Sequence, residues 1–118
     1  MKYVIIPSMV CLKDEKHKTC GVARSIKIIG SKWTTLLLHN LFEGKSRFGQ
    51  LERSMEGISP KTLSLRLKEL EEEGIIARKV FAEVPLHVEY ALTEKGKSLG
   101  NLFKVMEEWG EKYSEKSI

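Results

Sequence analysis

Apolar residues recur at helical spacing in two runs at the start of the patterned part of the chain. In the first run they stand at i, i+4 and i+7: Val22, Ile26 and Ile29. This spacing predicts a helix buried on one face, which Gly30 is placed to stop. Ser31 is a favourable N-cap for a second helix, and Gly44 can adopt the left-handed conformation that ends it. The apolar stripe of this second helix is Trp33, Leu36, Leu37 and Leu41.

Two further helices are predicted before residue 75. The first is short, with apolar positions at i, i+3 and i+7, and it runs to a break at Gly57: Phe48, Leu51 and Met55. Ser59-Pro60 is the strongest local signal in the chain, because Ser caps free amides and Pro at the first helical position has no N–H to leave unpaired. The helix that begins there ends at Gly74. Its apolar stripe is Leu63, Leu67 and Leu70.

The pattern then changes from helical to extended and back. Residues 76–81 and 88–92 read as two β-strands, the second with period-2 alternation, and Pro85 lies in the loop between them. Thr93 is expected to cap one final helix that continues almost to the C-terminus. Its apolar stripe is Leu99, Leu102, Phe103, Met106, Trp109 and Tyr113.

This order of elements predicts a mainly α protein with a small β-hairpin, an α+β winged helix-turn-helix fold. Two helices joined by a short glycine-containing turn form the helix-turn-helix, and the hairpin forms the wing. A chain of 118 residues suits one domain. We expect an N-terminal arm over residues 1–19 and a single winged helix-turn-helix domain over residues 20–118.

Charge and composition narrow the partners. The chain carries twenty Lys and Arg against sixteen Asp and Glu, and residues 1–32 hold a local excess of basic residues. This favours an anionic partner, although on charge alone a solvated basic tail is the simpler interpretation. No apolar run approaches the roughly 20 residues that cross a bilayer, so no membrane partner is expected. The two cysteines are compatible with a reducing compartment, and we expect a cytoplasmic protein.

The helix that opens at Ser59 has a candidate DNA-reading face opposite its leucines. Lysines there can reach phosphates or guanine O6 and N7, hydroxyls can bond base edges or phosphates, and an aliphatic side chain can meet a thymine methyl. Leu65 is alternatively an ordinary exposed leucine. Ser59 can add a phosphate contact at the helix N-terminus. The candidate residues are Ser59, Lys61, Thr62, Ser64, Leu65, Arg66 and Lys68.

Arg66 sits between the two faces of that helix, so a salt bridge to Glu69 or Glu73 competes with a DNA contact. The three consecutive acids, residues 71–73, indicate that the C-terminal end of the helix points away from phosphate. The predicted wing offers three more cations, for the DNA backbone or a narrow minor groove: Arg78, Lys79 and His87. Alternatively, these residues only protect the edge of a strand. Glu83 indicates a wing tip that is not uniformly basic.

The chain resembles the HxlR family of winged-helix transcription regulators over about residues 20–110. The resemblance rests on Cys20 and on motifs that recur in the same order and spacing. The motifs span residues 29–33 (IGSKW), 47–51 (RFGQL), 57–64 (GISPKTLS), 66–76 (RLKELEEEGII), 83–85 (EVP), 88–90 (VEY), 92–96 (LTEKG) and 109–110 (WG).

The resemblance implies a DNA-binding three-helical core with N- and C-terminal dimerisation helices, and a homodimer on an inverted-repeat operator. The final helix fits this independently, since its apolar stripe is longer than a domain of this size needs. Gly96 and Gly100 at i, i+4 would let another helix approach. Alternatively, the stripe packs on the monomer's own core. The candidate interface residues are Ile26, Leu102, Met106 and Trp109.

Some members of the family sense oxidants or electrophiles through a thiol at the position of Cys20. A helix N-terminus and the nearby Lys16 and Lys18 favour a thiolate there, so a redox or small-molecule effector is a hypothesis. Gly21 stands where the family usually has Pro, and Cys20 is alternatively an inert small hydrophobe. No cofactor is expected. A zinc site is disfavoured because a closed site needs four ligands and His39 and His87 belong to separate elements.

The sequence therefore predicts a homodimeric, sequence-specific regulator of transcription that binds double-stranded DNA. An alternative keeps the fold as a protein-interaction module without specific DNA binding. An enzyme is not expected, because the chain has no Ser/His/Asp set, no phosphate-cradling glycine loop and no paired carboxylates in a plausible cleft.

Overall fold

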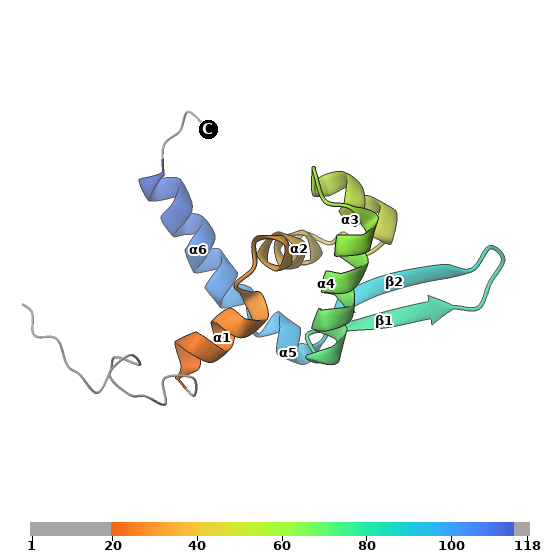
Figure 1. Ribbon diagram of the computed structural model, residues 1–118, viewed down its shortest axis with the longest axis horizontal. Coiled ribbons are helices and arrows are strands. Elements are labelled where there is room, and N and C mark those ends of the chain that lie inside the picture. The colour runs from red at the N-terminus through yellow and green to blue at the C-terminus, as the bar shows by residue number, and fades with distance from the viewer. Residues whose placement is uncertain (1–19, 115–118) are drawn as a thin grey trace, which may run out of the picture.

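The computed structural model describes residues 20–114, which form a helical body with one projecting hairpin (Figure 1). The expected N-terminal arm, including Cys11, Lys16 and Lys18, lies outside the described residues. The element order is α1 (Gly21–Ile29), α2 (Lys32–Phe42), α3 (Phe48–Ser54), α4 (Pro60–Glu72), β1 (Ile76–Phe81), β2 (His87–Leu92), α5 (Glu94–Lys97) and α6 (Gly100–Tyr113). This order is that of a winged helix-turn-helix, in which α3 and α4 form the helix-turn-helix and the β1–β2 hairpin forms the wing.

The core lies where α2, α3 and α4 meet the base of the hairpin. The predicted stripe of α4 is buried, and Leu37, Leu41, Leu51 and Met55 join it. One expectation was wrong: in α2 the chain buries Leu38, while Leu36 stays partly exposed. Since Leu36 and Leu38 lie about 200° apart around a helix, the buried face of α2 is rotated away from the predicted stripe.

The helix boundaries follow the predicted local signals. Ser31 and Ser59 accept the backbone N–H of Thr34 and Thr62, and Pro60 occupies the first position of α4. The stops after α2, α3 and α4 coincide with glycines that have positive φ: Gly44, Gly57 and Gly74. Because a side chain is strained in that conformation, glycine is the residue that ends these helices at lowest cost.

The wing is anchored to the helix-turn-helix by backbone hydrogen bonds. β1 and β2 pair antiparallel, with Arg78 opposite Tyr90 and Phe81 opposite His87. The N–H of Tyr90 donates to the carbonyl oxygen of Ser46, in the loop between α2 and α3, at 2.8 Å. The hairpin is therefore tied to the start of α3 at its base, while its tip projects from the body (Figure 1).

The single final helix that the sequence predicted is broken in two. Thr93 does cap a helix, but α5 ends at Lys97 and α6 begins at Gly100. Gly96 is pressed against Ile75, and a Cβ at Gly96 would lie 2.2 Å from the Ile75 carbonyl oxygen. α5 is therefore a short helix packed near the end of α4, and the chain changes direction before α6 begins.

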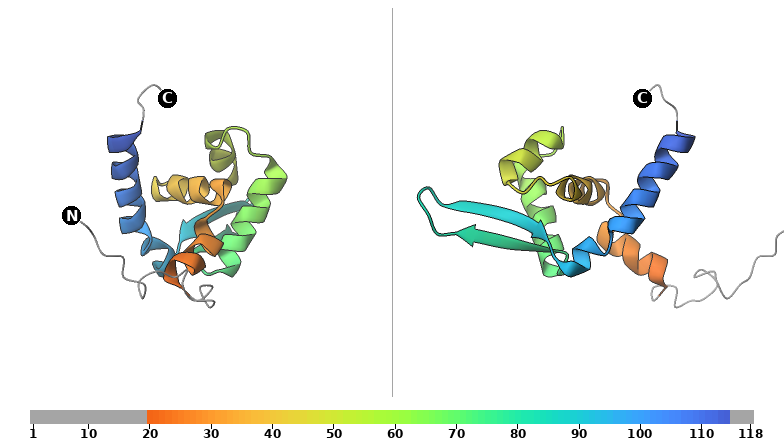
Figure 2. Two further views of the ribbon diagram at one scale, coloured as in Figure 1. Left: turned by 60° about the vertical axis from the view of Figure 1, so that its left-hand side comes forward. Right: turned by 180° about the vertical axis from the view of Figure 1, so that it is seen from behind.

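The two glycines expected to admit a partner helix have another role. Gly96 contacts the backbone of Ile75, and a Cβ at Gly100 would lie 3.4 Å from the ring of Phe42. Both close approaches are made within the chain. They orient α6, which together with α1 lies at the opposite end of the molecule from the wing (Figures 1 and 2).

Candidate nucleic-acid interface

The outward face of α4 is polar and accessible. Lys61, Ser64 and Lys68 are exposed, and Leu65 lies among them with 48% of its surface accessible. The leucines on the opposite face hold the helix against the core, so its orientation is fixed by burial. α4 therefore presents two lysines, a hydroxyl and an aliphatic side chain on one exposed surface.

The first turn of α4 uses its hydroxyls for capping. Ser59 Oγ accepts the N–H of Thr62 at 3.1 Å and donates to Thr62 Oγ1 at 3.0 Å. Thr62 is half-buried and Ser59 is exposed. Ser59 is thus committed to holding the helix start, and its hydroxyl proton is already donated within the chain.

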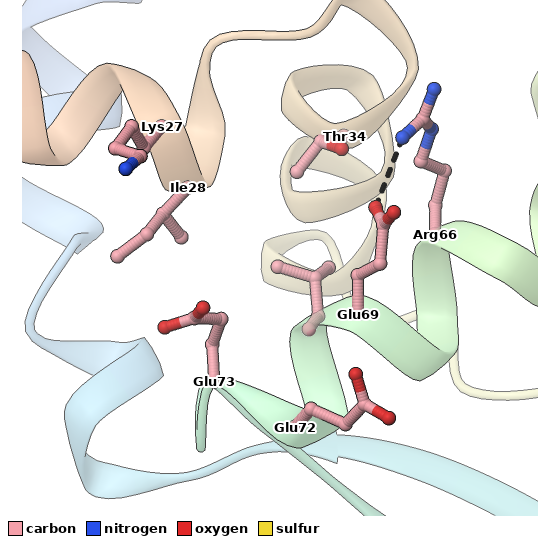
Figure 3. A pocket seen from close by; sticks show the side chains of 8 residues that line it. Lys27, Ile28, Thr34, Arg66, Glu69, Glu72 and Glu73 are labelled. Carbon is pink, nitrogen blue, oxygen red and sulfur yellow. Dashed lines mark hydrogen bonds and ion pairs between the residues drawn. The ribbon is translucent and has the colours of Figure 1, made fainter.

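Arg66 does not join the outward face. Its Nη1 donates to Glu69 Oε1 at 2.9 Å, which is the salt bridge that competed with a DNA contact in the sequence analysis. The pair lines a pocket of about 320 Å³ between α1, α2 and α4 (Figure 3). Glu72 and Glu73 line the same pocket, so the acidic end of α4 contributes to it.

The wing brings one of its predicted cations to the outward face of α4. Arg78 and Tyr90 line a second cleft of about 320 Å³ together with Ser64, Lys68 and Glu71, so one of the three acids expected to point away from phosphate lies beside this face. Lys79 pairs with Glu89 across the hairpin, and side chains alternate between the faces of a strand, so Lys79 points away from this cleft. Arg78 is therefore placed beside Ser64 and Lys68 of α4, and Lys79 is not.

His87 is held between two carboxylates of the wing. Its Nδ1 lies 2.6 Å from Glu83 Oε2 and its Nε2 lies 2.9 Å from Glu89 Oε2. The imidazole also lies against the ring of Phe81, with centroids 4.4 Å apart. Because both nitrogens are engaged, His87 does not present the unpaired cation that the sequence analysis expected from it.

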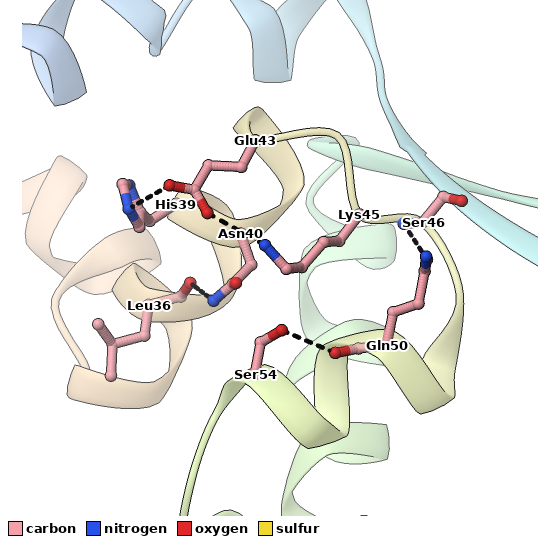
Figure 4. Close-up of polar contacts among 8 residues, drawn as sticks. All are labelled: Leu36, His39, Asn40, Glu43, Lys45, Ser46, Gln50 and Ser54. Atoms are coloured by element: carbon pink, nitrogen blue, oxygen red, sulfur yellow. Dashed lines mark hydrogen bonds and ion pairs between the residues drawn. The ribbon is translucent and has the colours of Figure 1, made fainter.

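Polar contacts set the direction in which the chain enters α3 (Figure 4). Gln50 Oε1 accepts the N–H of Ser46 at 3.0 Å and the N–H of Arg47 at 2.9 Å. A side chain three residues into the helix thus satisfies backbone donors that would otherwise lack partners. The loop that this fixes is also the one that binds β2, so α3 and the wing share an anchor.

A charged cluster lies at the preceding turn, also in Figure 4. Lys45 Nζ lies 3.1 Å from Glu43, and His39 Nε2 lies 3.2 Å from it. The hydrogen bond from Lys45, with the charges of His39 and Lys45, lowers the pKa of the Glu43 carboxyl below its usual value. All three side chains lie at the surface, where such pairs contribute little to stability.

Two arginines that the sequence analysis did not single out lie near the wing. Arg47 and Arg53 are exposed and line a cleft between α3 and β2. The RFGQL motif contains Arg47, but its position opposite the wing depends on the tertiary fold. No periodicity along the chain indicates that these arginines face β2.

The candidate dimerisation residues are exposed in the single chain. Ile26 is 59% exposed and Trp109 is 64% exposed, and Leu102 and Met106 are also accessible. Of the predicted stripe on the last helix, Phe103 is the residue of α6 that enters the core. The alternative, in which the whole stripe packs on the chain's own core, is therefore wrong.

Cys20 is the N-cap residue of α1 and is disulfide-bonded. Its sulfur is thus oxidised in this structure. Within residues 20–114 no group of three or more His, Cys, Asp or Glu side chains is placed to hold a metal ion. No helix in this part of the chain is long and apolar enough to cross a membrane.

The helix-turn-helix, the exposed polar face of its second helix and the adjoining hairpin define the class of winged helix-turn-helix proteins. Residues 28–118 match the family described as HxlR-like helix-turn-helix. The chain therefore belongs to the HxlR-like helix-turn-helix family, a family of transcriptional regulators.

Individual relatives agree with this assignment. The HTH-type transcriptional regulator YdeP of Bacillus subtilis is 42% identical over 103 residues, which cover 87% of this chain and 80% of YdeP. The redox regulator HypR in its oxidised form is 40% identical with a TM-score of 0.76, covering 81% of this chain and 99% of HypR. The reduced form of the transcriptional regulator YodB from B. subtilis is 38% identical with a TM-score of 0.70, covering 81% of this chain and 95% of YodB.

Proposed function

We propose that the protein is a sequence-specific transcriptional regulator that binds an inverted-repeat operator as a homodimer. The observation that carries the proposal is the outward face of α4, where Lys61, Ser64 and Lys68 are exposed and Arg78 of the wing lies beside Ser64 and Lys68. Lysine and hydroxyl groups pair with base edges and phosphates in the major groove, which is wide enough to admit a helix. In a helix-turn-helix the second helix is the one that enters that groove.

The homodimer is supported by the apolar surface of α1 and α6. Large apolar side chains are accessible there, among them Ile26, Leu102, Met106 and Trp109, although the described residues already have a core of their own. Exposed apolar patches on small proteins mark interaction sites, and a twofold-symmetric pair would cover the same patch on both copies. Such a pair would present two α4 helices, which is the arrangement that an inverted repeat requires.

The operator is to be identified by selecting bound sequences from a random duplex pool. We expect two half-sites in inverted orientation, with an affinity that falls steeply with salt because phosphate neutralisation releases counterions. If Lys61 reads a guanine, Lys61→Ala should weaken binding to the operator by about 1–3 kcal/mol and remove the preference for guanine at that one base position. If Lys61 holds a phosphate, the variant should weaken binding to all sequences by the same factor. Equal affinity of the wild-type protein for selected and random duplexes would refute the proposal.

A protein-interaction module is the competing function. Protein-docking surfaces are depleted in lysine and enriched in aromatic side chains. The face of α4 has the opposite character, with two exposed lysines and a serine around one leucine. The competing function would gain support only if the selected pool showed no enriched sequence.

We further propose that oxidants alter DNA binding through Cys20. Two observations support this: Cys20 lies at the start of α1, on the proposed dimer side, and it is disulfide-bonded. Solved structures of similar proteins include the redox regulator HypR and diamide-treated YodB. Diamide converts two thiols to a disulfide and is itself reduced to the hydrazine, which balances the two electrons.

The test compares wild-type protein with Cys20→Ser, and with Cys11→Ser as the variant of the other cysteine. All are first reduced, then treated with diamide and titrated with operator. Cys20→Ser should bind the operator as reduced wild-type protein does and should show no change of affinity with diamide. An unchanged diamide response in Cys20→Ser would eliminate Cys20 as the sensor.

A further inference from the structure

A cleft of about 470 Å³ separates the first turns of α3 from the outer part of β2. One wall carries Arg47 and Arg53, and the opposite wall carries Leu86, His87 and Val88. No Asp or Glu is among the residues that line it. Glu83 and Glu89, the carboxylates of the wing near the cleft, are both paired with His87. The cleft is thus bordered by positive charge on the helix side.

The two guanidinium groups are not neutralised within the described chain. The ion pairs among residues 20–114 include one arginine, which is Arg66. A Cβ at Gly49 would lie 3.3 Å from an Nη atom of Arg53, so the absence of a side chain at Gly49 leaves room for that guanidinium. Because Gly49 lies one turn before Arg53, the Arg53 head is directed toward the end of α3 where Arg47 stands.

The pocket between α1, α2 and α4 differs from this cleft in its charges. There the arginine, Arg66, is paired, and Glu69, Glu72 and Glu73 line the walls. A phosphate would be repelled by these carboxylates. Unpaired guanidinium groups, in contrast, match the geometry of phosphate oxygens and bind them with two parallel N–H donors.

We propose that the cleft between α3 and the wing is a phosphate clamp, in which Arg47 and Arg53 hold a phosphodiester of the DNA backbone. The proposal rests on the proposed function, because it takes the duplex to be the one that α4 reads. In a helix-turn-helix the first helix, here α3, crosses the backbone while the second lies in the groove. The strand would then pass between α3 and Leu86. Such a contact sets the position of the protein on the duplex without reading its sequence.

The first test measures affinity for duplex DNA as a function of salt concentration. Arg53→Ala and Arg47→Ala should each reduce the slope of log affinity against log salt. The double variant should reduce it by about 0.9 for each half-site, because the clamped phosphate is then no longer neutralised. Affinity for selected and random duplexes should fall by the same factor. Lys97→Ala removes one positive charge from exposed α5 and is the control, expected to leave the slope unchanged. Slopes that stay at the wild-type value in both arginine variants would overturn the clamp.

A conservative variant distinguishes the effect of losing the charge of Arg53 from the effect of disturbing the fold. Arg53→Lys keeps the charge and should keep the slope while losing part of the affinity, since the two-donor contact is gone. Arg53→Gln keeps a polar side chain of intermediate length but no charge, and should reduce the slope of log affinity against log salt as Arg53→Ala does. If Arg53→Gln retained the wild-type slope, the charge of Arg53 would have no part in binding.

The second test locates the phosphate. Single phosphates of the duplex are replaced in turn by neutral methylphosphonates, and each duplex is titrated with wild-type protein and with Arg47→Ala/Arg53→Ala. At one position in each half-site the replacement should weaken the wild-type protein and have no further effect on the double variant. Additive losses at every position would contradict the clamp.

Failure of the clamp and failure of the proposed function give different results. If the wild-type protein shows no sequence preference, the proposed function fails, but the slopes on random duplex still test the clamp. If the operator is bound specifically and the arginine variants behave as wild type, the clamp alone fails.

Discussion

The two exposed sides of this molecule differ in chemistry more than in structure. On the side of α3, α4 and the wing, the accessible residues include lysines, arginines and hydroxyls, with Leu65 on α4 and Val84 and Leu86 on the wing. On the side of α1 and α6 they include Val22, Ile26, Met106 and Trp109. Both surfaces are carried by amphipathic helices whose other face packs on one core.

This difference separates two kinds of partner. An exposed apolar surface gains free energy when another apolar surface removes it from water, at roughly 25 cal/mol per Å². A cationic surface gains by replacing the counterions of a polyanion. The α1–α6 side is thus suited to a second copy of the chain and the α3–α4–wing side to DNA. The side chains of the second side differ in their partners: Arg66 is paired with a carboxylate and His87 lies between two, whereas no ion pair among residues 20–114 includes Arg47 or Arg53.

The largest expected effect comes from placing a charge on the apolar side. Met106→Glu should make the protein monomeric, because a carboxylate cannot be buried in an apolar interface without a partner. Operator affinity should then fall on the order of 100-fold, since the two half-sites are no longer bound by one linked molecule. Sedimentation and operator titration measure the two quantities.

Val84→Glu is the matched control for this change. Val84 is an apolar residue at the wing tip with 98% of its surface exposed, on the other side of the molecule. This variant should keep the oligomeric state of the wild-type protein. A Met106→Glu protein that remains dimeric would show that the α1–α6 side is not the interface.

The next effect concerns α5, the short helix that connects the wing to α6. Gly96→Ala forces a methyl group toward the Ile75 carbonyl oxygen, where no flexible side chain can yield. We expect a loss of about 1–3 kcal/mol in the free energy of unfolding, measured with urea. Gly110→Ala, in α6 with no atom within 4 Å of the added Cβ, should be neutral or slightly stabilising. Equal stability of the two variants would contradict the close packing of α5.

A smaller effect is expected from a single charge on α4. Lys68→Ala should weaken operator binding about tenfold, roughly 1.4 kcal/mol, and leave thermal stability unchanged because Lys68 is exposed. Lys104→Ala removes an exposed charge from α6 and should leave affinity unchanged. Equal losses in the two variants would mean that binding responds to total charge and not to the face of α4.

The smallest effect concerns the surface cluster at Glu43. The pKa of Glu43 is lowered, so the folded protein favours the charged carboxyl, and its contribution to stability is present above the unfolded pKa. That contribution is lost as the pH falls through the folded pKa. The small stability difference between wild-type protein and Glu43→Gln should therefore shrink on acidification. A difference that is independent of pH would show that the ion pairs with Lys45 and His39 do not stabilise the fold.

Most of the fold could be predicted from the sequence because its boundaries are set locally. Ser59-Pro60 and the glycines 44, 57 and 74 act within one turn of where they stand, and the structure places helix ends there. The break between α5 and α6 could not be predicted in this way. It accompanies the contact of Gly96 with Ile75, which lies in the loop between α4 and β1, about 20 residues earlier in the chain.

The candidate site was predictable in part for the same reason. The outward face of α4 follows from helical periodicity, since burying Leu63, Leu67 and Leu70 exposes Lys61 and Lys68. The pairing of His87 with two glutamates and the approach of Arg47 and Arg53 to the wing depend on how the hairpin folds back. The approach of Arg47 and Arg53 to the wing joins segments more than 30 residues apart, whereas His87 pairs with glutamates within four residues of it once the hairpin has formed. No periodicity of the sequence encodes either contact.

Operator recognition by this protein requires α4 to enter the major groove, and chemical protection of guanine N7 measures this directly. N7 lies in the major groove, so bound protein should protect guanines in two patches, one per half-site and roughly one helical turn of about 34 Å apart. Lys61→Ala should lose part of that protection at one position in each patch. A duplex that is fully bound while every N7 remains as reactive as in free DNA would contradict the account.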